Sequence, residues 1–332
     1  MLMLEDLPTG PVDPQARDFL DRLNAASLPT VDKLTPAQAR AQMEVSARFL
    51  GRPPRVSEVR DVKIDGPGGP IPIRVVRPIR PDEGPLPVVV YFHGGGWVVG
   101  DLASHEGLCR ALANASGAIV ASVGYRLAPE HPFPAAADDA FAAYSWFASR
   151  AGEVGGDPSR VAACGDSAGG NLAAVVCLMA RDRGVPGPTL QALAYPALDC
   201  DFETESYRRF AEGHLLSRDE MMWYWDQYLP DRADRARPYA SPLRAESLAG
   251  LPPALVITAG HDVLRDEGER YAGRLHAEGV PTTLSRYPGM IHGFLRRYPF
   301  FDEGRRAVDE VATALRRAFG LTGTSRGVDG AG

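Results

Sequence analysis

The chain has 332 residues, of which 45% are hydrophobic and 23% charged, a composition ordinary for a soluble globular protein. Its formal net charge of −6 argues against a protein that binds nucleic-acid phosphates. No apolar run approaches the roughly 20 residues of a membrane-spanning helix, and residues 1–8 lack the basic start and the sustained apolar core of a secretory signal.

Residues 1–50 are predicted to be helical and amphipathic. Asp13-Pro14 and Thr35-Pro36 each place a capping side chain before a proline at the first helical position. Both helices precede the first predicted strand and need not belong to a sheet. This N-terminal segment is therefore either a packing appendage or a cover over a site.

A period-two pattern runs from Val56 to Ile64, and a second one runs from Ile71 to Val75. A turn rich in glycine and proline at residues 66–70 separates the two. This pattern predicts an antiparallel hairpin at the edge of a sheet.

Six short apolar runs then alternate with helical patterns. The runs cover residues 88–92, 118–123, 161–164, 190–195, 254–258 and 282–287, and the helical patterns cover residues 104–115, 136–150, 168–182, 264–278 and 302–319. With the hairpin, this alternation predicts an α/β fold with a mostly parallel central sheet of about eight strands flanked by helices. We assign residues 51–199 and 251–320 to this core. Ligands of such sheets bind at the carboxyl ends of the strands.

Residues 200–250 interrupt the alternation with many large apolar and aromatic side chains. Ser217, followed by acidic residues, predicts the start of a helix there. The insertion is either a helix packed on the domain or a helical cap whose apolar face lines a pocket for an apolar substrate. The candidate pocket residues are Trp97, Phe202, Trp223, Trp225 and Tyr228. We expect residues 321–332 to form a flexible tail.

The sequence Gly165-Asp166-Ser167-Ala168-Gly169-Gly170 lies between a predicted strand and a predicted helix. Small residues two positions on either side of Ser167 allow a turn so tight that the serine is strained and its hydroxyl is exposed at the top of the sheet. The following helix offers free N–H groups and a positive dipole end to an anion. The motif predicts a nucleophilic serine, provided that a base, an acid and further oxyanion donors exist elsewhere.

The loop His93-Gly94-Gly95-Gly96-Trp97 follows the buried strand 88–92. Three consecutive glycines leave backbone N–H groups free to face a developing negative charge. Glycine-rich loops also form turns or bind phosphates, but neither the G-K-[ST] nor the G-x-G-x-x-G pattern is present here. We therefore expect an oxyanion hole, with His93 in a structural role.

A serine hydroxyl needs a base to become a nucleophile. Among the seven histidines, His292 suits this role because it follows a predicted strand late in the chain. The orienting acid is expected between the serine and the histidine. Asp262, directly after the strand 254–258, fits this position better than its rivals Asp266 and Asp199. The order Ser, Asp, His matches that of α/β hydrolases.

With these parts together, the sequence resembles the hormone-sensitive-lipase-like group of α/β hydrolases, the bacterial family IV carboxylesterases. The motifs that carry the resemblance span residues 85–295 in the expected order: His93-Gly94-Gly95-Gly96-Trp97, Tyr125-Arg126-Leu127-Ala128-Pro129-Glu130, Gly165-Asp166-Ser167-Ala168-Gly169-Gly170, Asp262-Val263-Leu264-Arg265-Asp266 and His292-Gly293-Phe294. The two segments outside the core are similar to that family's cap.

The resemblance implies a serine carboxylesterase for short- to medium-chain esters. Ser167 would be the nucleophile, His292 the base and Asp262 the orienting acid. The N–H groups of Gly95, Gly96 and Ala168 would hold the oxyanion. The supporting residues would be His93, Gly94 and Asp166, of which Asp166 would brace the glycine loop. The expected substrate is a small-molecule ester, and no metal or organic cofactor is expected.

Several alternatives stay open at this stage. The motifs do not separate ester hydrolysis from lactone, amide or carbamate hydrolysis, and a non-catalytic small-molecule receptor on the same fold is a more distant alternative. The strand 282–287 at a sheet edge suggests a possible homodimer. The four cysteines show no C-x-x-C or zinc-site spacing, so we expect them to fill apolar space in a cytoplasmic protein.

Overall fold

The computed structural model describes residues 9–80 and 84–321, and these residues form an eight-stranded sheet. Its strands are β1 (Glu58–Ile64), β2 (Ile71–Arg77), β3 (Leu86–Phe92), β4 (Ile119–Val123), β5 (Gly156–Asp166), β6 (Gln191–Ala194), β7 (Ala254–His261) and β8 (Thr282–Ile291). The tail predicted at residues 321–332 lies outside the described residues, except for Leu321.

The strand order across the sheet is β1-β2-β4-β3-β5-β6-β7-β8. β2 pairs antiparallel with both β1 and β4, whereas every pair from β4 to β8 is parallel. The predicted edge hairpin and mostly parallel sheet are thus confirmed. Every residue of β3 is buried, as a strand covered on both faces requires.

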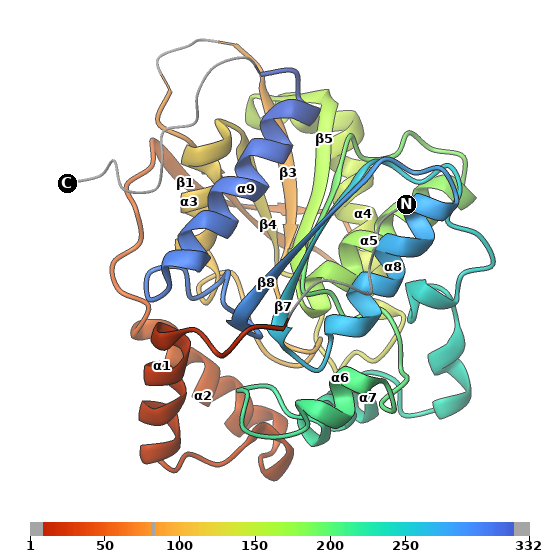
Figure 1. The fold of residues 1–332 in the computed structure, drawn as a ribbon. Coiled ribbons are helices and arrows are strands. Elements are labelled where there is room, and N and C mark those ends of the chain that lie inside the picture. Colours follow the sequence, from red (N-terminus) through yellow and green to blue (C-terminus); the bar gives the residue numbers. More distant parts are fainter. Residues whose placement is uncertain (1–8, 81–83, 322–332) are drawn as a thin grey trace.

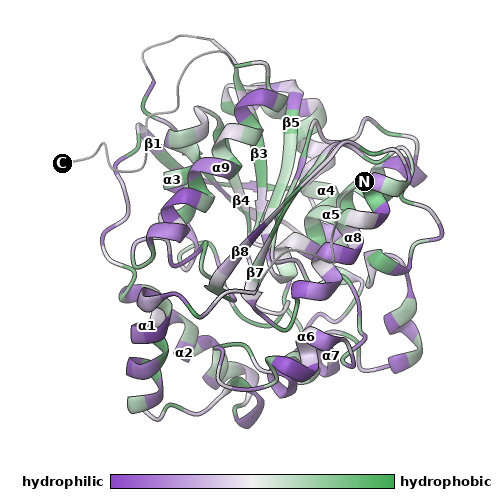
Figure 2. Cartoon of the chain, viewed as in Figure 1, coloured by the Kyte–Doolittle hydropathy of each residue, from purple (hydrophilic) through white to green (hydrophobic). Residues whose placement is uncertain are grey.

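Helices cover both faces of the sheet (Figure 1). α3 (Glu106–Ser116) and α9 (Asp302–Ala318) share one apolar cluster with the sheet, and α4 (Ala135–Arg150), α5 (Ala168–Asp182) and α8 (Arg265–Ala277) share the other. Figure 2 shows hydrophilic residues on the outside of α9, whereas β3 is hydrophobic. The sheet is therefore the middle of three layers, and its parallel strands end together at one edge.

Two segments outside the sheet lie together at the carboxyl ends of the strands (Figure 1). We call residues 9–50 the N-terminal segment and residues 200–250 the inserted segment. Their helices are α1 (Pro14–Ala25), α2 (Pro36–Arg48), α6 (Glu205–Arg209) and α7 (Arg218–Tyr228), and short 3₁₀ helices occur at Val31–Lys33, Arg232–Ala236, Pro242–Arg244 and, in the core, Ala151–Val154. The N–H group of Val31 donates to Glu220 Oε1 at 3.3 Å and so links the two segments.

The helix starts in both segments follow from their capping residues. Asp13 accepts hydrogen bonds from the first turn of α1, and Thr35 forms a capping box with Gln38 at the start of α2. Ser217 forms a second capping box with Glu220 at the start of α7. These side chains satisfy N–H groups that a helix leaves without an intrahelical acceptor. The division of the chain into a core and a two-part cap stays a prediction.

The structure corrects one predicted boundary. The sequence suggested a strand over residues 282–287 followed by a loop, whereas β8 continues to Ile291. β7 is longer as well, and a register shift lets His261 pair with Ile291. A Cβ atom on Gly260 would overlap the carbonyl oxygen of Pro288, so only glycine permits this close approach. The residues that follow the two strands are thereby brought side by side.

Two further expectations concern burial and membrane insertion. All four cysteines lie in the described part of the chain and are free, and Cys109, Cys164 and Cys177 are buried as apolar fillers. Across residues 9–80 and 84–321, every helix is too short or too polar to span a bilayer.

α5 packs closely against the end of β3. A Cβ atom on Gly169 would overlap the carbonyl oxygen of Phe92. Gly169→Ala should therefore force the backbones apart and lower the free energy of unfolding by about 3 kcal/mol, at the upper end for overpacked cores. Urea unfolding measures this change. Gly107→Ala is the matched control, because its added methyl group meets nothing within 4 Å and helix propensity favours alanine. Equal stability of the two variants would contradict the prediction.

Candidate active site

Ser167 lies in the turn between β5 and α5, with φ of 56° and ψ of −121°. This left-handed conformation is strained for a residue with a side chain. The turn is tight because a Cβ atom on Gly165 would overlap the backbone of Gly169. The N–H group of Ser167 donates to Ala194 O at 2.8 Å, which ties the turn to the end of β6. The predicted strained serine between strand and helix is thus present.

The three predicted triad side chains lie in hydrogen-bond contact. His292 Nε2 is 3.0 Å from Ser167 Oγ, and His292 Nδ1 is 2.7 Å from Asp262 Oδ2. Asp262 is buried, and its other carboxylate oxygen accepts the N–H group of Leu264 at 3.0 Å. An acceptor beside Nδ1 places the proton on that nitrogen, so Nε2 is left to accept the serine proton.

Each of these side chains follows the last residue of a parallel strand. Ser167 follows β5, Asp262 follows β7 and His292 follows β8. The ring of Tyr195, next to β6, packs edge-on against the imidazole of His292 with centroids 4.7 Å apart. The sheet and this ring therefore fix the histidine from two sides.

The rival acids take part in other interactions. Asp266 accepts the N–H group of Ser206 at 2.8 Å and pairs with Arg265, so it joins α6 to α8. Asp199 pairs with Arg244. The geometry therefore favours Asp262 as the partner of the histidine.

The glycine loop after β3 has the backbone conformation that its sequence predicts. Gly95 has φ of 121° and Gly96 has φ of 57°, values that side-chain-bearing residues rarely adopt. Among the described residues, neither of their N–H groups, nor that of Ala168 at the start of α5, has a hydrogen-bond acceptor. These three predicted donors are thus available to an anion.

The carboxylate of Asp166 contacts the glycine loop. Its carboxylate accepts the hydroxyl of Tyr91 at 2.6 Å and the N–H group of Gly94 at 2.9 Å, and His105 Nε2 lies 3.5 Å away. Burial alone would raise the pKa of Asp166, but His105, Tyr91 and the Gly94 N–H group outweigh it and hold that pKa well below its usual range. The buried group is therefore a carboxylate.

His93 is buried and contacts the backbone of the glycine loop, and its supporting role stays a prediction. Its Nδ1 is 2.8 Å from Gly94 O, and the hydroxyl of Tyr125 donates to His93 O at 2.7 Å. Burial, together with the neighbouring His105, lowers the pKa of His93 to about 4. Arg126, the residue after Tyr125, pairs with Asp139. The motif at residues 125–130 is therefore held by contacts within the protein.

The five pocket candidates differ in their surroundings. Trp97 stacks on Tyr228 with centroids 4.3 Å apart and meets Trp225 edge-on at 5.0 Å, and all three are fully buried. Phe202 and Trp223 are half-buried. The buried trio anchors α7 to the glycine loop, and the pocket-lining role of all five stays a prediction.

The sequence of this chain is similar to those of known hydrolases. Residues 89–296 match the sequence profile of the alpha/beta hydrolase fold family. Carboxylic ester hydrolase LipN of Mycobacterium tuberculosis is 45% identical over 284 residues, or 84% of this chain and 75% of LipN. Carboxylesterase NlhH of that organism is 41% identical over 312 residues, or 92% of this chain and 96% of NlhH. This chain belongs to the α/β-hydrolase family.

A solved structure extends the likeness to the whole fold. The hyperthermophilic esterase of the archaeon Pyrobaculum calidifontis superposes with a TM-score of 0.89 at 45% identity, covering 93% of this chain and 99% of that one. The resemblance to the hormone-sensitive-lipase-like group is thereby confirmed, and the protein is a carboxylic ester hydrolase.

The hydrolase also contains site residues that the sequence did not reveal. His105 faces Asp166, Tyr195 supports His292, and the ring of Tyr224 fills the space that a Cβ atom on Gly96 would need. None of these three residues belongs to a local sequence motif. The large apolar and aromatic side chains of residues 200–250 were the one signal that indicated Tyr224. In the described part of the hydrolase, no three histidine, cysteine, aspartate or glutamate residues are grouped so that they could hold a metal ion.

The charge of Asp166 predicts a pH-dependent contribution to stability. Because its pKa is lower in the folded than in the unfolded hydrolase, its stabilising effect is complete above the unfolded value of about 4 and is lost as the pH falls towards the folded value. Asp166→Asn should lower the free energy of unfolding by about 2–3 kcal/mol near neutral pH, and this deficit should shrink below about pH 4.

Urea unfolding of both proteins across this pH range measures the deficit. Asp21→Asn removes the same charge from the exposed face of α1 and serves as the control. A deficit that does not change with pH, or that Asp21→Asn reproduces, would contradict the assigned role of Asp166.

Proposed function

We propose that Ser167, His292 and Asp262 form a catalytic triad that hydrolyses small-molecule carboxylic esters through an acyl-enzyme intermediate. The observation that carries this proposal is the continuous chain of contacts, 3.0 Å from Ser167 Oγ to His292 Nε2 and 2.7 Å from His292 Nδ1 to Asp262 Oδ2. It lies beside backbone N–H groups that have no acceptor among the described residues. A nucleophile, an oriented base and oxyanion donors together suit acyl transfer.

In the first step, His292 takes the proton of Ser167 as the hydroxyl oxygen attacks the ester carbonyl. The negative charge that forms on the carbonyl oxygen is held by the N–H groups of Gly95, Gly96 and Ala168. The protonated imidazole, stabilised by Asp262, then gives its proton to the departing alcohol. Water repeats the sequence on the acyl-enzyme and releases the carboxylic acid.

The strained conformation of Ser167 supports this role. Its φ of 56° holds the serine at the amino end of α5, with the N–H group of Ala168 as the next donor along the chain. The positive end of the helix dipole favours the same negative charge. Nucleophile and stabilising donor therefore come from one rigid turn, and the geometry needs no adjustment during the reaction.

We further propose that short- to medium-chain acyl groups are preferred. The ring of Tyr224 on α7 lies against Gly96, directly next to the proposed oxyanion donors. Ser167 and His292 are only 7% and 9% exposed, so the space above them is restricted. A long acyl chain would have to displace the inserted segment.

The same machinery would serve a lactone, amide or carbamate hydrolase, since these reactions share the tetrahedral intermediate. A small-molecule receptor on this fold has less support, because it would not need the paired contacts of Ser167, His292 and Asp262. The cytoplasmic location and a homodimer through the edge strand β8 stay predictions.

Removal of the nucleophile tests the proposed reaction. Ser167→Ala should lower kcat for p-nitrophenyl esters by roughly 10⁴-fold or more, because the acyl-enzyme can no longer form. A panel from acetate to laurate also measures the chain-length preference. Ser149→Ala, on the exposed end of α4, is the matched control. Activity retained by a folded Ser167→Ala variant would rule out the proposed nucleophile.

Comparison of two neighbouring acids tests the proposed triad acid. Asp262→Asn should lower kcat roughly 10³–10⁴-fold with little change in KM, because His292 loses the carboxylate that fixes its tautomer. Asp266→Asn removes the same charge from a residue that joins α6 to α8, so it should lower thermal stability and leave kcat within about tenfold. Steady-state kinetics and melting curves separate the two effects, and the reverse ranking of the kcat values would overturn the assignment.

A further inference from the structure

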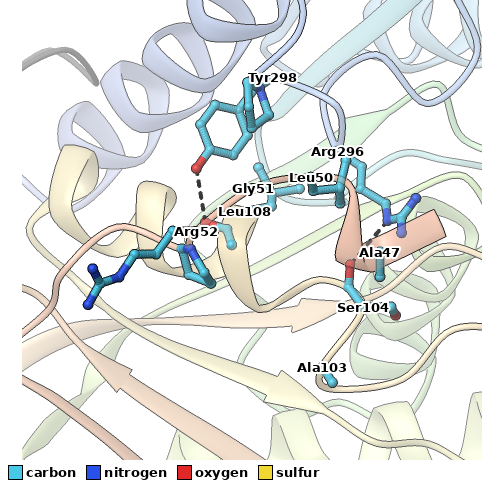
Figure 3. Close-up of a pocket in the computed structure, with 12 residues that line it drawn as sticks. Ala47, Leu50, Gly51, Arg52, Ala103, Ser104, Leu108, Arg296 and Tyr298 are labelled. Atoms are coloured by element: carbon cyan, nitrogen blue, oxygen red, sulfur yellow. Dashed lines mark hydrogen bonds between the residues drawn. The ribbon is translucent and has the colours of Figure 1, made fainter. Parts of the chain in front are cut away.

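A small pocket lies outside the proposed triad, since Ser167, Asp262 and His292 do not line it. It has a volume of about 50 Å³ and lies between the end of α2, the start of α3 and the segment after His292 (Figure 3). The residues that line it are Ala47, Leu50, Gly51, Arg52, Pro53, Ala103, Ser104, Gly107, Leu108, Arg296, Tyr298 and Pro299. The proposed reaction does not use it.

Arg296 places a buried positive charge beside this pocket. Its side chain is 4% exposed, and Nε donates to Ser104 O at 3.1 Å. Nη2 is buried and has no hydrogen-bond partner among the described residues. Figure 3 shows the guanidinium beside Ser104, whereas the side chain of Arg52 points away from it. A buried cationic donor without an acceptor is costly, so such groups normally have an anionic or polar partner.

The surroundings do not supply that partner. Within the described ranges, no carboxylate forms an ion pair with Arg296. Glu106, the nearest acid on α3, pairs with Arg74 and Arg110 instead. Burial lowers the pKa of the Arg296 guanidinium, and the charges of Asp166 and Asp101, neither of which forms an ion pair with it, offset this only in part. The cation next to the pocket is therefore incompletely neutralised.

The amino end of α3 adds further donors. The backbone N–H groups of Gly107 and Leu108, in the first turn of this helix of 11 residues, have no acceptor among the described residues, and no side chain caps the helix start. Both residues line the pocket. Free first-turn N–H groups and the helix dipole favour a negative charge.

We propose that this pocket binds one small monovalent anion, held by Arg296 and by the first turn of α3. The volume of about 50 Å³ suits a halide or a short carboxylate such as formate or acetate. Short carboxylates are also the acids that hydrolysis of small esters releases. Halides and short carboxylates both carry a compact single negative charge. The bound anion would come either from inorganic salt or from the carboxylic acid that ester hydrolysis releases.

An anion there would stabilise segments that lead to the active site. The backbone N–H group of Arg296 donates to the hydroxyl of Tyr195 at 3.4 Å, and the ring of Tyr195 packs on His292. On the other side, Ser104 Oγ lies 3.0 Å from His105 Nδ1, and His105 faces Asp166. A bound anion therefore raises the stability of the fold without touching the ester.

Thermal unfolding of the full chain at constant ionic strength tests the site. Sodium chloride and sodium acetate are each titrated in place of sodium gluconate, whose bulky anion fits a pocket of about 50 Å³ poorly. We expect Tm to rise with the logarithm of the anion concentration above Kd, by about 2–4 °C at roughly ten times Kd. A rise with chloride alone identifies a halide site, and a rise with acetate alone identifies a carboxylate site. No rise above gluconate with either salt would overturn the proposal.

Two variants locate the effect. Arg296→Met keeps the length of the side chain but removes its donors, and the rise should disappear. Ala47→Leu, on the last turn of α2, fills the pocket while Arg296 stays intact, so it keeps the test valid if Arg296→Met does not fold. Ala41→Leu on the exposed face of α2 should retain the full rise. A full rise in Ala47→Leu would place the anion elsewhere, including the oxyanion hole, and would refute the pocket site.

Discussion

The close packing of α5 against the end of β3 is the constraint on which the rest of the site depends. Gly165 and Gly169 have no Cβ atoms, so the first turn of the helix touches the backbone of the strands. This contact places the strained turn with Ser167 next to the loop that follows β3. Ser167, the proposed nucleophile, and the glycine loop are therefore positioned by backbone contacts, which vary less than contacts between flexible side chains.

The buried charge of Asp166 completes this arrangement. It follows the last apolar residues of β5, and its carboxylate bonds to Gly94 in the glycine loop. An ionised group is stable there only because Tyr91, Gly94 and His105 surround it with donors or positive charge. One residue thus joins the serine turn to the glycine loop.

The sequence predicts the sheet well, and it predicts which three side chains lie in contact at its carboxyl edge, because both depend on local signals. Ser167, Asp262 and His292 each follow an apolar strand, and parallel strands bring such positions to one edge. His105, Tyr195 and Arg296 carry no such signal, since their roles depend on contacts between residues far apart in the chain. The end of β8 was misplaced for a related reason. Its length depends on Gly260 in β7, which allows the neighbouring strand to approach.

The N-terminal and inserted segments are held in place by side-chain contacts, whereas the strand ends of the core are positioned by backbone contacts. α7 is attached through the stacked rings of Trp97, Trp225 and Tyr228, and the N-terminal segment reaches it through Val31 and Glu220. These are side-chain contacts, so substitutions can reshape the space above Ser167 without disturbing the strand ends that carry the triad. A hydrolase built in this way keeps its reaction while its substrate preference changes. For this reason the motifs indicate the reaction, whereas the proposed preference among esters depends on the aromatic packing of the inserted segment.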